Sequence, residues 1–254
     1  MLVLAHGGSP EWNRLVEETV AQAGLAAPTE IAFGMGMHAG EVAAVQRAVA
    51  QLESKGVSRI IAVPLLVSSN SEVMRQFEYL LGLRERGSWE KHAHPVALQV
   101  PVTMTQALDD DPVVTEILAE RAQAISRHPG EETLVLVAHG PTSDEDNDRW
   151  LAAMRRVADG VKAQGGYRTV IAVTMRDDAP EPVVDQATRE LRALVEAAGG
   201  EALVVPLLLA RGGIESKIPK RLAGLTYRYR GETLLPHLKL SQWIATQVLA
   251  KSSL

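Results

Sequence analysis

Two histidines in this sequence occupy the same kind of position, directly after a short apolar run and directly before a glycine. "VLAHGG" covers residues 3–8, and "VLVAHGP" covers residues 135–141. A neutral imidazole binds divalent metals and accepts protons near neutral pH. Glycine lets the backbone turn tightly and leaves room for a ligand close to the chain. His6 and His139 are therefore candidates for metal binding and acid–base chemistry, with capping of the next helix as the structural alternative.

Further polar residues fall at or just after the ends of predicted strands. They are His38, Glu72, Arg176, Asp177 and Glu215. In parallel α/β sheets, ligands gather beyond the carboxyl ends of the strands. We therefore expect these side chains to share a histidine–carboxylate site at the strand ends. The alternatives are a solvated loop position for His38 and, for Glu72, a helix-start acid favoured by the helix dipole.

The elements that position these residues follow from hydrophobic periodicity. Short β-branched runs alternate with longer amphipathic stretches, which predicts an α/β protein with a largely parallel sheet. Strands are predicted at 2–5, 30–34, 59–67, 96–101, 133–138, 168–174, 202–209 and 225–229. Helices are predicted at 10–24, 41–55, 71–82, 112–127, 145–164, 181–198, 214–222 and 240–251. Ser9 and Ser143 are suitable N-caps for the helices that follow the two histidines.

The two halves of the chain look like copies of one unit. "VLAHG" matches "LVAHG", and "IAVPLLV" matches "LVVPLLL", in the same order. Such ordered matches indicate an internal duplication, and the segment 127–130 breaks the pattern between the halves. We predict two tandem similar domains, residues 1–128 and 129–254. Each is a mainly parallel four-stranded sheet flanked by helices, with a cleft between the domains that both histidines face.

The composition excludes several classes of function. The net charge is −5 with acids and bases interspersed, so no nucleic-acid or anionic-membrane surface is indicated. The absence of cysteine excludes disulfides and thiolate metal sites. No apolar run approaches the roughly 20 residues that span a bilayer, and no signal peptide is evident. We expect a cytoplasmic protein, although a removed leader is compatible with a first strand that begins at Leu2.

Three motif readings fail on their context. "HGGS" resembles the oxyanion loop of lipases, but no Gly-x-Ser-x-Gly elbow supplies a nucleophile. "GMGMHAG", residues 34–40, imitates a dinucleotide fingerprint, but it follows the second predicted strand, and the next strand ends without an acid for a ribose. No Gly-rich Lys-Ser/Thr loop is present. A histidine–carboxylate site without a nucleotide cofactor is the remaining reading. Three further histidines lie in polar loops and are not expected in it: His92, His94 and His128.

The order of these motifs resembles a known family. Strand-"AHG", then strand-"VPLL", then "GGIESKIPKRLAGL" at residues 212–225, is similar to the class II chelatases of the CbiX type. These are sirohydrochlorin cobaltochelatases and ferrochelatases, and the resemblance covers nearly the whole chain as two tandem domains. It implies a lyase that inserts Co²⁺ or Fe²⁺ into a tetrapyrrole on the way to cobalamin or sirohaem. Imidazole and carboxylate would also accept Ni²⁺.

The family's functional residues carry over only in part. Its first histidine falls on His6 and, through the repeat, on His139, whereas its second histidine falls on Glu72. In the second half, the same place holds Ile214 and Glu215. This departure leaves two hypotheses, a metal chelatase and a non-catalytic tetrapyrrole- or metal-binding relative. An unrelated hydrolase that uses the cleft is a third.

The resemblance also suggests a division of labour between the halves. His6, His38 and Glu72 would hold the metal. Arg176, with Arg211 and Glu215, would bind the tetrapyrrole, since arginine pairs with its carboxylates and repels a metal ion. The expected partner is a small-molecule tetrapyrrole, and the divalent metal is a substrate. The oligomeric state is not indicated.

Overall fold

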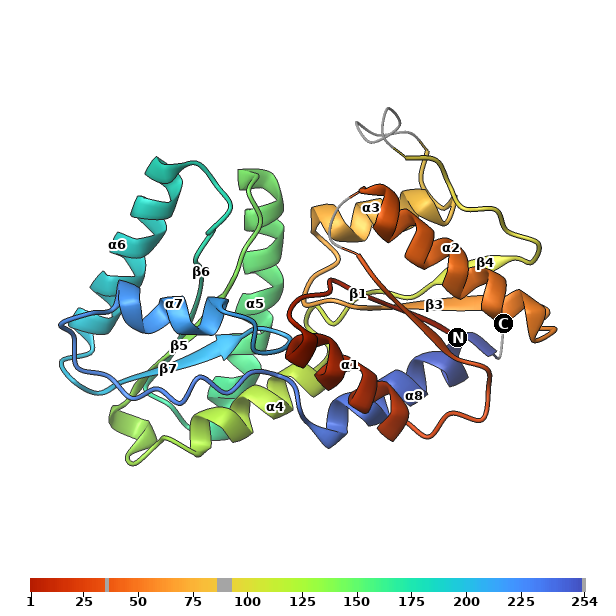
Figure 1. Ribbon diagram of the computed structural model, residues 1–254. Helices are drawn as coiled ribbons and strands as arrows, with labels where there is room; N and C mark the ends of the chain where they lie inside the picture. The colour runs from red at the N-terminus through yellow and green to blue at the C-terminus, as the bar shows by residue number, and fades with distance from the viewer. Residues whose placement is uncertain (35–36, 86–92, 253–254) are drawn as a thin grey trace. The chain divides into compact units, whose positions relative to one another are not determined.

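The computed structural model describes residues 1–34, 37–85 and 93–252. His92 and residues 35–36 of the segment 34–40 lie outside the described residues. The chain forms two compact units (Figure 1). The first comprises residues 1–108 together with 238–254, and the second comprises residues 109–237.

The first unit contains a parallel four-stranded sheet. In spatial order its strands are β2 (Glu30–Phe33), β1 (Leu2–Ala5), β3 (Ile60–Leu65) and β4 (Val102–Met104). The central strands β1 and β3 are fully buried, as expected for parallel strands that are covered on both faces. Ala5 is in register with Phe33 and with Leu65, so these three strands end at one edge.

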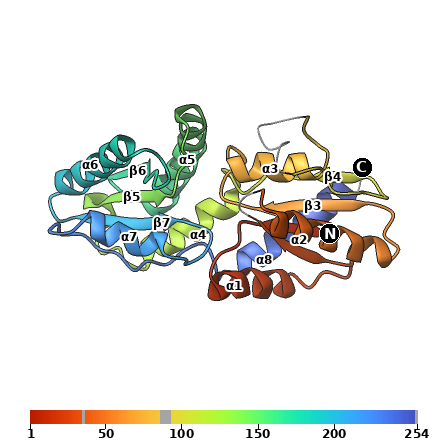
Figure 2. The same ribbon diagram turned by 45° about the horizontal axis from the view of Figure 1, so that its top comes forward.

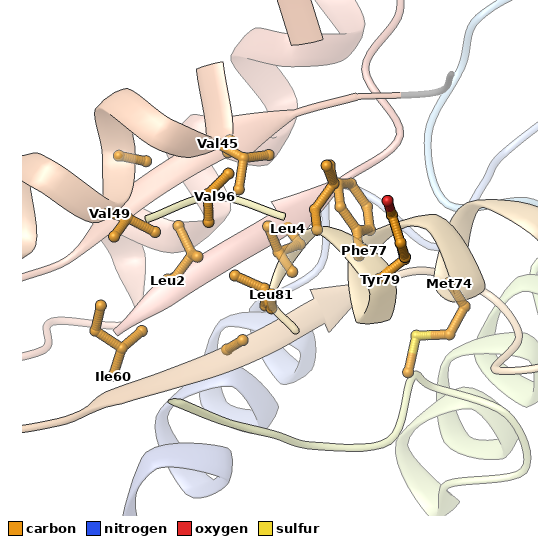
Figure 3. Packing of buried hydrophobic residues seen from close by; sticks show 14 of the residues in the cluster. Leu2, Leu4, Val45, Val49, Ile60, Met74, Phe77, Tyr79, Leu81 and Val96 are labelled. Atoms are coloured by element: carbon orange, nitrogen blue, oxygen red, sulfur yellow. The ribbon is translucent and has the colours of Figure 1, made fainter. Parts of the chain in front are cut away.

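Helices cover both faces of this sheet. They are α1 (Pro10–Gln22), α2 (Ala39–Ser54), α3 (Glu72–Leu80) and α8 (Leu238–Ser252). α2 and α3 lie on one face, where Leu2 and Leu4 of β1 pack with Val45, Val49 and Phe77 (Figure 3). α1 and α8 lie on the opposite face in contact with each other (Figure 1).

The second unit contains a parallel three-stranded sheet in the order β6 (Thr169–Thr174), β5 (Thr133–Ala138) and β7 (Ala202–Leu207). Its helices are α4 (Pro112–Gln123), α5 (Asp144–Gly165), α6 (Glu181–Ala197) and α7 (Ile214–Arg221), with a short 3₁₀ turn at Pro129–Glu131. α6 and α7 share a core with β5 and β7, in which Val135 and Val204 pack with Leu191 and Ile218. Figure 2 shows α6 and α7 beside this sheet.

The last strand of each predicted sheet differs from the expectation. In the first unit, the strand expected at 96–101 lies instead at 102–104. The N–H groups of Ala97 and Gln99 donate to Gln46 and Glu53 of α2 at 2.8 and 2.6 Å. These residues are therefore held by α2. Pairing with β3 begins at Pro101, whose carbonyl accepts from Ile60 at 2.9 Å.

In the second unit, the strand expected at 225–229 is only a bridge. Arg228 pairs with β7 through its own N–H to Ala202 and through the N–H of Val204 to its carbonyl. The chain then turns at Gly231, which has φ +67°. The predicted α/β architecture is confirmed, with one sheet of four strands and one of three.

The compact units do not coincide with the ranges 1–128 and 129–254 expected from the repeat. α4 belongs to the second unit, where it contacts α5 and β7, and α8 belongs to the first unit, where it contacts α1 and β3. Both helices bury apolar side chains, among them Ile117 and Ile244, which are fully buried. The apolar residues of each helix require burial but do not determine which sheet covers them. Each helix therefore packs on the sheet of the other half of the sequence.

The internal repeat is visible in the strand register. Pro64 of β3 lies opposite Leu4 of β1, and Pro206 of β7 lies opposite Val137 of β5. His6 lies two residues after Leu4, and His139 lies two residues after Val137. The two units are therefore similar in topology and register, and each histidine leaves the middle strand of its three adjacent parallel strands.

Candidate functional site

His6 leaves the carboxyl end of β1 with its side chain exposed to solvent. Its Nδ1 atom lies 2.8 Å from the carbonyl oxygen of Gly7. A carbonyl only accepts, so this contact requires a proton on Nδ1 and leaves the lone pair of a neutral imidazole on Nε2. The ring centroid lies 6.5 Å from that of Trp12, which is buried at the start of α1. His6 is thus placed to offer Nε2 to a metal ion or a proton.

His139 occupies the equivalent position after β5, but its ring is held differently. Its side chain is 30% exposed, and Nε2 lies 3.4 Å from a carboxylate oxygen of Asp178. A carboxylate facing Nε2 favours a proton on that nitrogen. The two histidines are therefore not equivalent, because Nδ1 of His6 faces a backbone carbonyl whereas Nε2 of His139 faces an acid. His139 is better suited to handling protons than to binding a cation.

His38 lies at the N-cap position of α2, with an exposed side chain. Its backbone N–H donates to the carboxylate of Glu41 at 3.3 Å. The residue thus marks the start of a helix. Within residues 1–34, 37–85 and 93–252, no group of three or more His, Asp or Glu side chains is arranged to hold a metal ion. The structure does not assemble His6, His38 and Glu72 into a three-ligand site, and their role as ligands stays a prediction.

Glu72 is the first residue of α3, and its side chain is 53% exposed. Its carboxylate lies 2.9 Å from the guanidinium of Arg75, one turn further along the helix. Ser71 caps the helix by accepting the N–H of Met74 at 3.2 Å. An acid at this place is stabilised by the helix dipole. The carboxylate of Glu72 is therefore already engaged by a cation.

Arg176 follows β6, and its side chain points into the loop after His139. The side chain is only 10% exposed. Its Nε donates to the carbonyl of Pro141 at 3.1 Å, and one terminal nitrogen donates to the carboxylate of Asp144 at 2.6 Å. The other terminal nitrogen donates to the carbonyl of Thr142. This internal use contrasts with the expected role of Arg176 in binding a tetrapyrrole carboxylate.

Asp177 and Glu215 also have structural partners within the second unit. The side chain of Asp177 is 3% exposed and forms ion pairs with Lys217, at 2.9 Å, and with Arg221. The carboxylate of Glu215 accepts the N–H groups of Gly212 and Gly213 at 3.1 and 2.9 Å. Glu215 thus organises the start of α7, whereas Asp177 pairs with the middle and the last residue of that helix.

Arg211 is exposed in the loop between β7 and α7. The hydroxyl of Tyr229 donates to the carbonyl of Glu215 at 2.5 Å. Burial raises the pKa of Tyr229, nearby Glu215 raises it further, and Arg211 opposes this rise. Arg211 is thus an exposed cation beside a neutral phenol. It remains a candidate for binding an acidic substituent.

Two residues of the site were not predicted from the sequence. Asp178 lies against His139, and Trp12 lies against His6. The only sequence signal for Asp178 is the pair of acids in "MRDDAP" after β6. Trp12 carries no signal of its own, because an aromatic residue at the start of an amphipathic helix is usually a core residue.

Comparison with known proteins decides the family. The CbiX family model matches residues 1–125 and 133–251. The chain belongs to the CbiX family. The resemblance of the strand exits to class II chelatases is thereby confirmed, and the two matched segments correspond to the two halves of the repeat. No curated protein matches the chain. In the described part of the chain, every helix is too short or too polar to cross a membrane.

Solved structures confirm the chelatase-like fold. SirB from Bacillus subtilis with Fe³⁺ is 17% identical with a TM-score of 0.66, over 98% of this chain and 93% of SirB. CbiX, described as the terminal enzyme for siroheme biosynthesis in denitrifying bacteria, is 17% identical with a TM-score of 0.63, over 98% and 97%. DR2241 from Deinococcus radiodurans, a multi-domain protein with structural similarity to chelatases, is 22% identical with a TM-score of 0.55. The alignment covers 98% of this CbiX family member and 53% of DR2241.

Proposed function

We propose that this protein inserts Co²⁺ or Fe²⁺ into a sirohydrochlorin-like tetrapyrrole. Membership of the CbiX family supports the reaction class. The observation that carries the proposal is the orientation of His6, because its Nδ1 lies against the carbonyl of Gly7 and its Nε2 lone pair is left for coordination. An imidazole nitrogen is a suitable ligand for either metal.

The reaction needs two kinds of group. The metal must be held before it enters the macrocycle, and two pyrrole N–H protons must leave as the four nitrogens bind it. We assign the first task to His6, whose imidazole is exposed. We assign proton handling to His139, whose ring is paired with Asp178 at 3.4 Å. Arg211 is the exposed cation for a carboxylate of the macrocycle.

A second function is favoured by one observation at Glu72. Where the family has its second histidine, this chain has a carboxylate that pairs with Arg75 at 2.9 Å. A chelatase that lost this ligand would hold the metal or the tetrapyrrole without turnover. The alternative is therefore a tetrapyrrole- or metal-binding protein of the same fold.

Metal insertion into sirohydrochlorin, followed by absorbance, separates the two functions. The proposal expects turnover with Co²⁺ or Fe²⁺ that is lost in His6→Ala and kept in His94→Ala, which removes an exposed histidine of a polar loop. Binding of sirohydrochlorin without turnover would support the binding protein instead. In that case Glu72→His is the informative variant, since restored turnover would identify the missing imidazole as the cause.

A further inference from the structure

We propose that Arg176 is a positioning residue that holds His139 at the edge of its sheet, and that it does not bind the carboxylates of the substrate. This inference rests on the proposed function only in giving His139 a role in the reaction. The geometry of the second unit carries the rest. The positioning role replaces the role in substrate binding that an arginine at a strand end suggests for Arg176.

The first argument is the set of acceptors around the guanidinium. Two are backbone carbonyls, those of Pro141 and Thr142, and the third is the carboxylate of Asp144. Pro141 and Thr142 lie in the short segment that connects His139 to α5, and Asp144 is the first residue of α5. A guanidinium donates from three separate nitrogens in fixed directions, whereas the three donors of an ammonium group share one nitrogen. Arg176 therefore fixes the path of this loop.

The second argument is the backbone of Arg176 itself. Its N–H donates to the carbonyl of His139 at 2.6 Å. The residue has φ +53°, a conformation that non-glycine residues rarely adopt. Such a conformation persists where surrounding contacts hold it, and here the buried side chain supplies them. Main chain and side chain thus act on the same loop.

The third argument is the placement of Asp178. It follows Arg176 by two residues and lies 3.4 Å from Nε2 of His139. The turn at Arg176 therefore sets both the backbone of His139 and the carboxylate that faces its ring. A buried guanidinium with three partners has little surface left for a ligand, since its side chain is only 10% exposed. Positioning accounts for all of these contacts, whereas substrate binding accounts for none.

The test compares Arg176→Ala and Arg176→Lys with Arg149→Ala. Arg149 is a matched control because it is an exposed arginine of the same unit and pairs with Glu145 of its own helix. The first readout is the rate at which diethyl pyrocarbonate modifies His139, followed by peptide mass mapping. The second is kcat and KM for sirohydrochlorin with Co²⁺. The first readout does not depend on activity.

We expect His139 to be modified several-fold faster in both Arg176 variants and at the wild-type rate in Arg149→Ala. We expect kcat to fall roughly tenfold to a hundredfold, because small misplacements of a reacting group have effects of this size, with KM little changed. Lysine should not rescue, since it cannot bridge the three acceptors. Asp144→Asn, which leaves both carbonyl contacts in place, should act in the same direction but more weakly.

A rise in KM at constant kcat, with unchanged modification of His139 and rescue by lysine, would overturn the proposal in favour of substrate binding. If the wild type inserts no metal, the proposed function fails, and the modification rates still decide whether Arg176 positions His139. If Arg176→Ala does not fold, Arg176→Lys and Asp144→Asn provide the comparison.

Discussion

A Cβ atom on Gly140 would lie 2.5 Å from the Cβ atom of Thr174, the last residue of the neighbouring strand β6. Gly140 also has φ +77°, which L side chains rarely adopt. In the first unit, Gly7 has φ +82°, and its Cβ would lie 3.1 Å from that of Phe33, the last residue of β2. The glycine behind each histidine is thus required by the turn and by the adjacent strand exit.

Gly140→Ala should destabilise the second unit. The unfavourable backbone conformation costs about 1–3 kcal/mol, and contact with Thr174 adds to it. Urea denaturation measures the effect. Gly130→Ala is the matched control, because no atom lies within 4 Å of the added Cβ and the residue lacks a positive φ. Equal unfolding midpoints for the two variants would contradict the prediction.

Local features of this fold were predictable from the sequence because short-range chemistry determines them. Ser9 and Ser143 were predicted as N-caps, and each accepts the N–H three residues on, at 3.2 and 3.1 Å. The strand ends at His6 and His139 were placed correctly because apolar runs end where polar residues begin. Ordered repeats of such features were enough for the fold class.

Partners distant in sequence were not predictable. A cation at a strand end suggests a ligand, yet Arg176 is satisfied by the loop after the neighbouring strand. An acid in a glycine-rich loop suggests a site, yet Glu215 caps its own helix. Whether such a side chain binds a ligand or an internal partner depends on a few ångströms of backbone path, which the residue types do not specify. The packing of α4 and α8 likewise depends on contacts that the residue types do not specify.

Glu132 should be a main source of acid sensitivity in the second unit. Its side chain is fully buried and lies 2.6 Å from Arg228. Burial alone would raise its pKa, but hydrogen bonds from the backbone of His128, from Ser126 and from the backbone of Arg127, together with the charge of Arg228, hold the pKa below its usual 4.5. A lowered carboxyl pKa contributes stability above about pH 4.5. This contribution is lost as the pH falls through the folded-state value.

Glu132→Ala should therefore cost about 3–5 kcal/mol near pH 7, as for loss of one partner of a buried ion pair. The difference from wild type should shrink below pH 4.5. Urea denaturation across this pH range measures both. Glu201→Ala is the control, because Glu201 also pairs with Arg228, at 3.1 Å, but is 45% exposed. A difference that stays constant with pH would show that the charge of Glu132 contributes nothing.

Co²⁺ binding at His6 should quench the fluorescence of Trp12. The ring centroids are 6.5 Å apart, so an ion on Nε2 would lie close to the indole. We expect saturable quenching near pH 7, where a free imidazole is mostly neutral. The quenching should be lost in His6→Ala and retained in His139→Ala and His94→Ala. Equal loss in the His6 and His139 variants would contradict the assignment of metal binding to the first unit.

Helix α8 should stabilise the first unit, and helix α4 should stabilise the second unit, although each comes from the other half of the sequence. Ile244 of α8 and Ile117 of α4 are both fully buried, and replacing either by alanine should cost about 2–5 kcal/mol. α8 belongs to the compact unit of residues 1–108. Ile244→Ala should therefore speed amide hydrogen exchange in β1 and β3, while Ile117→Ala should speed it in β5 and β7. Each variant serves as the control for the other. The reverse pattern would mean that each helix stabilises its own half of the repeat, in which case the units would follow the sequence boundary at residue 128.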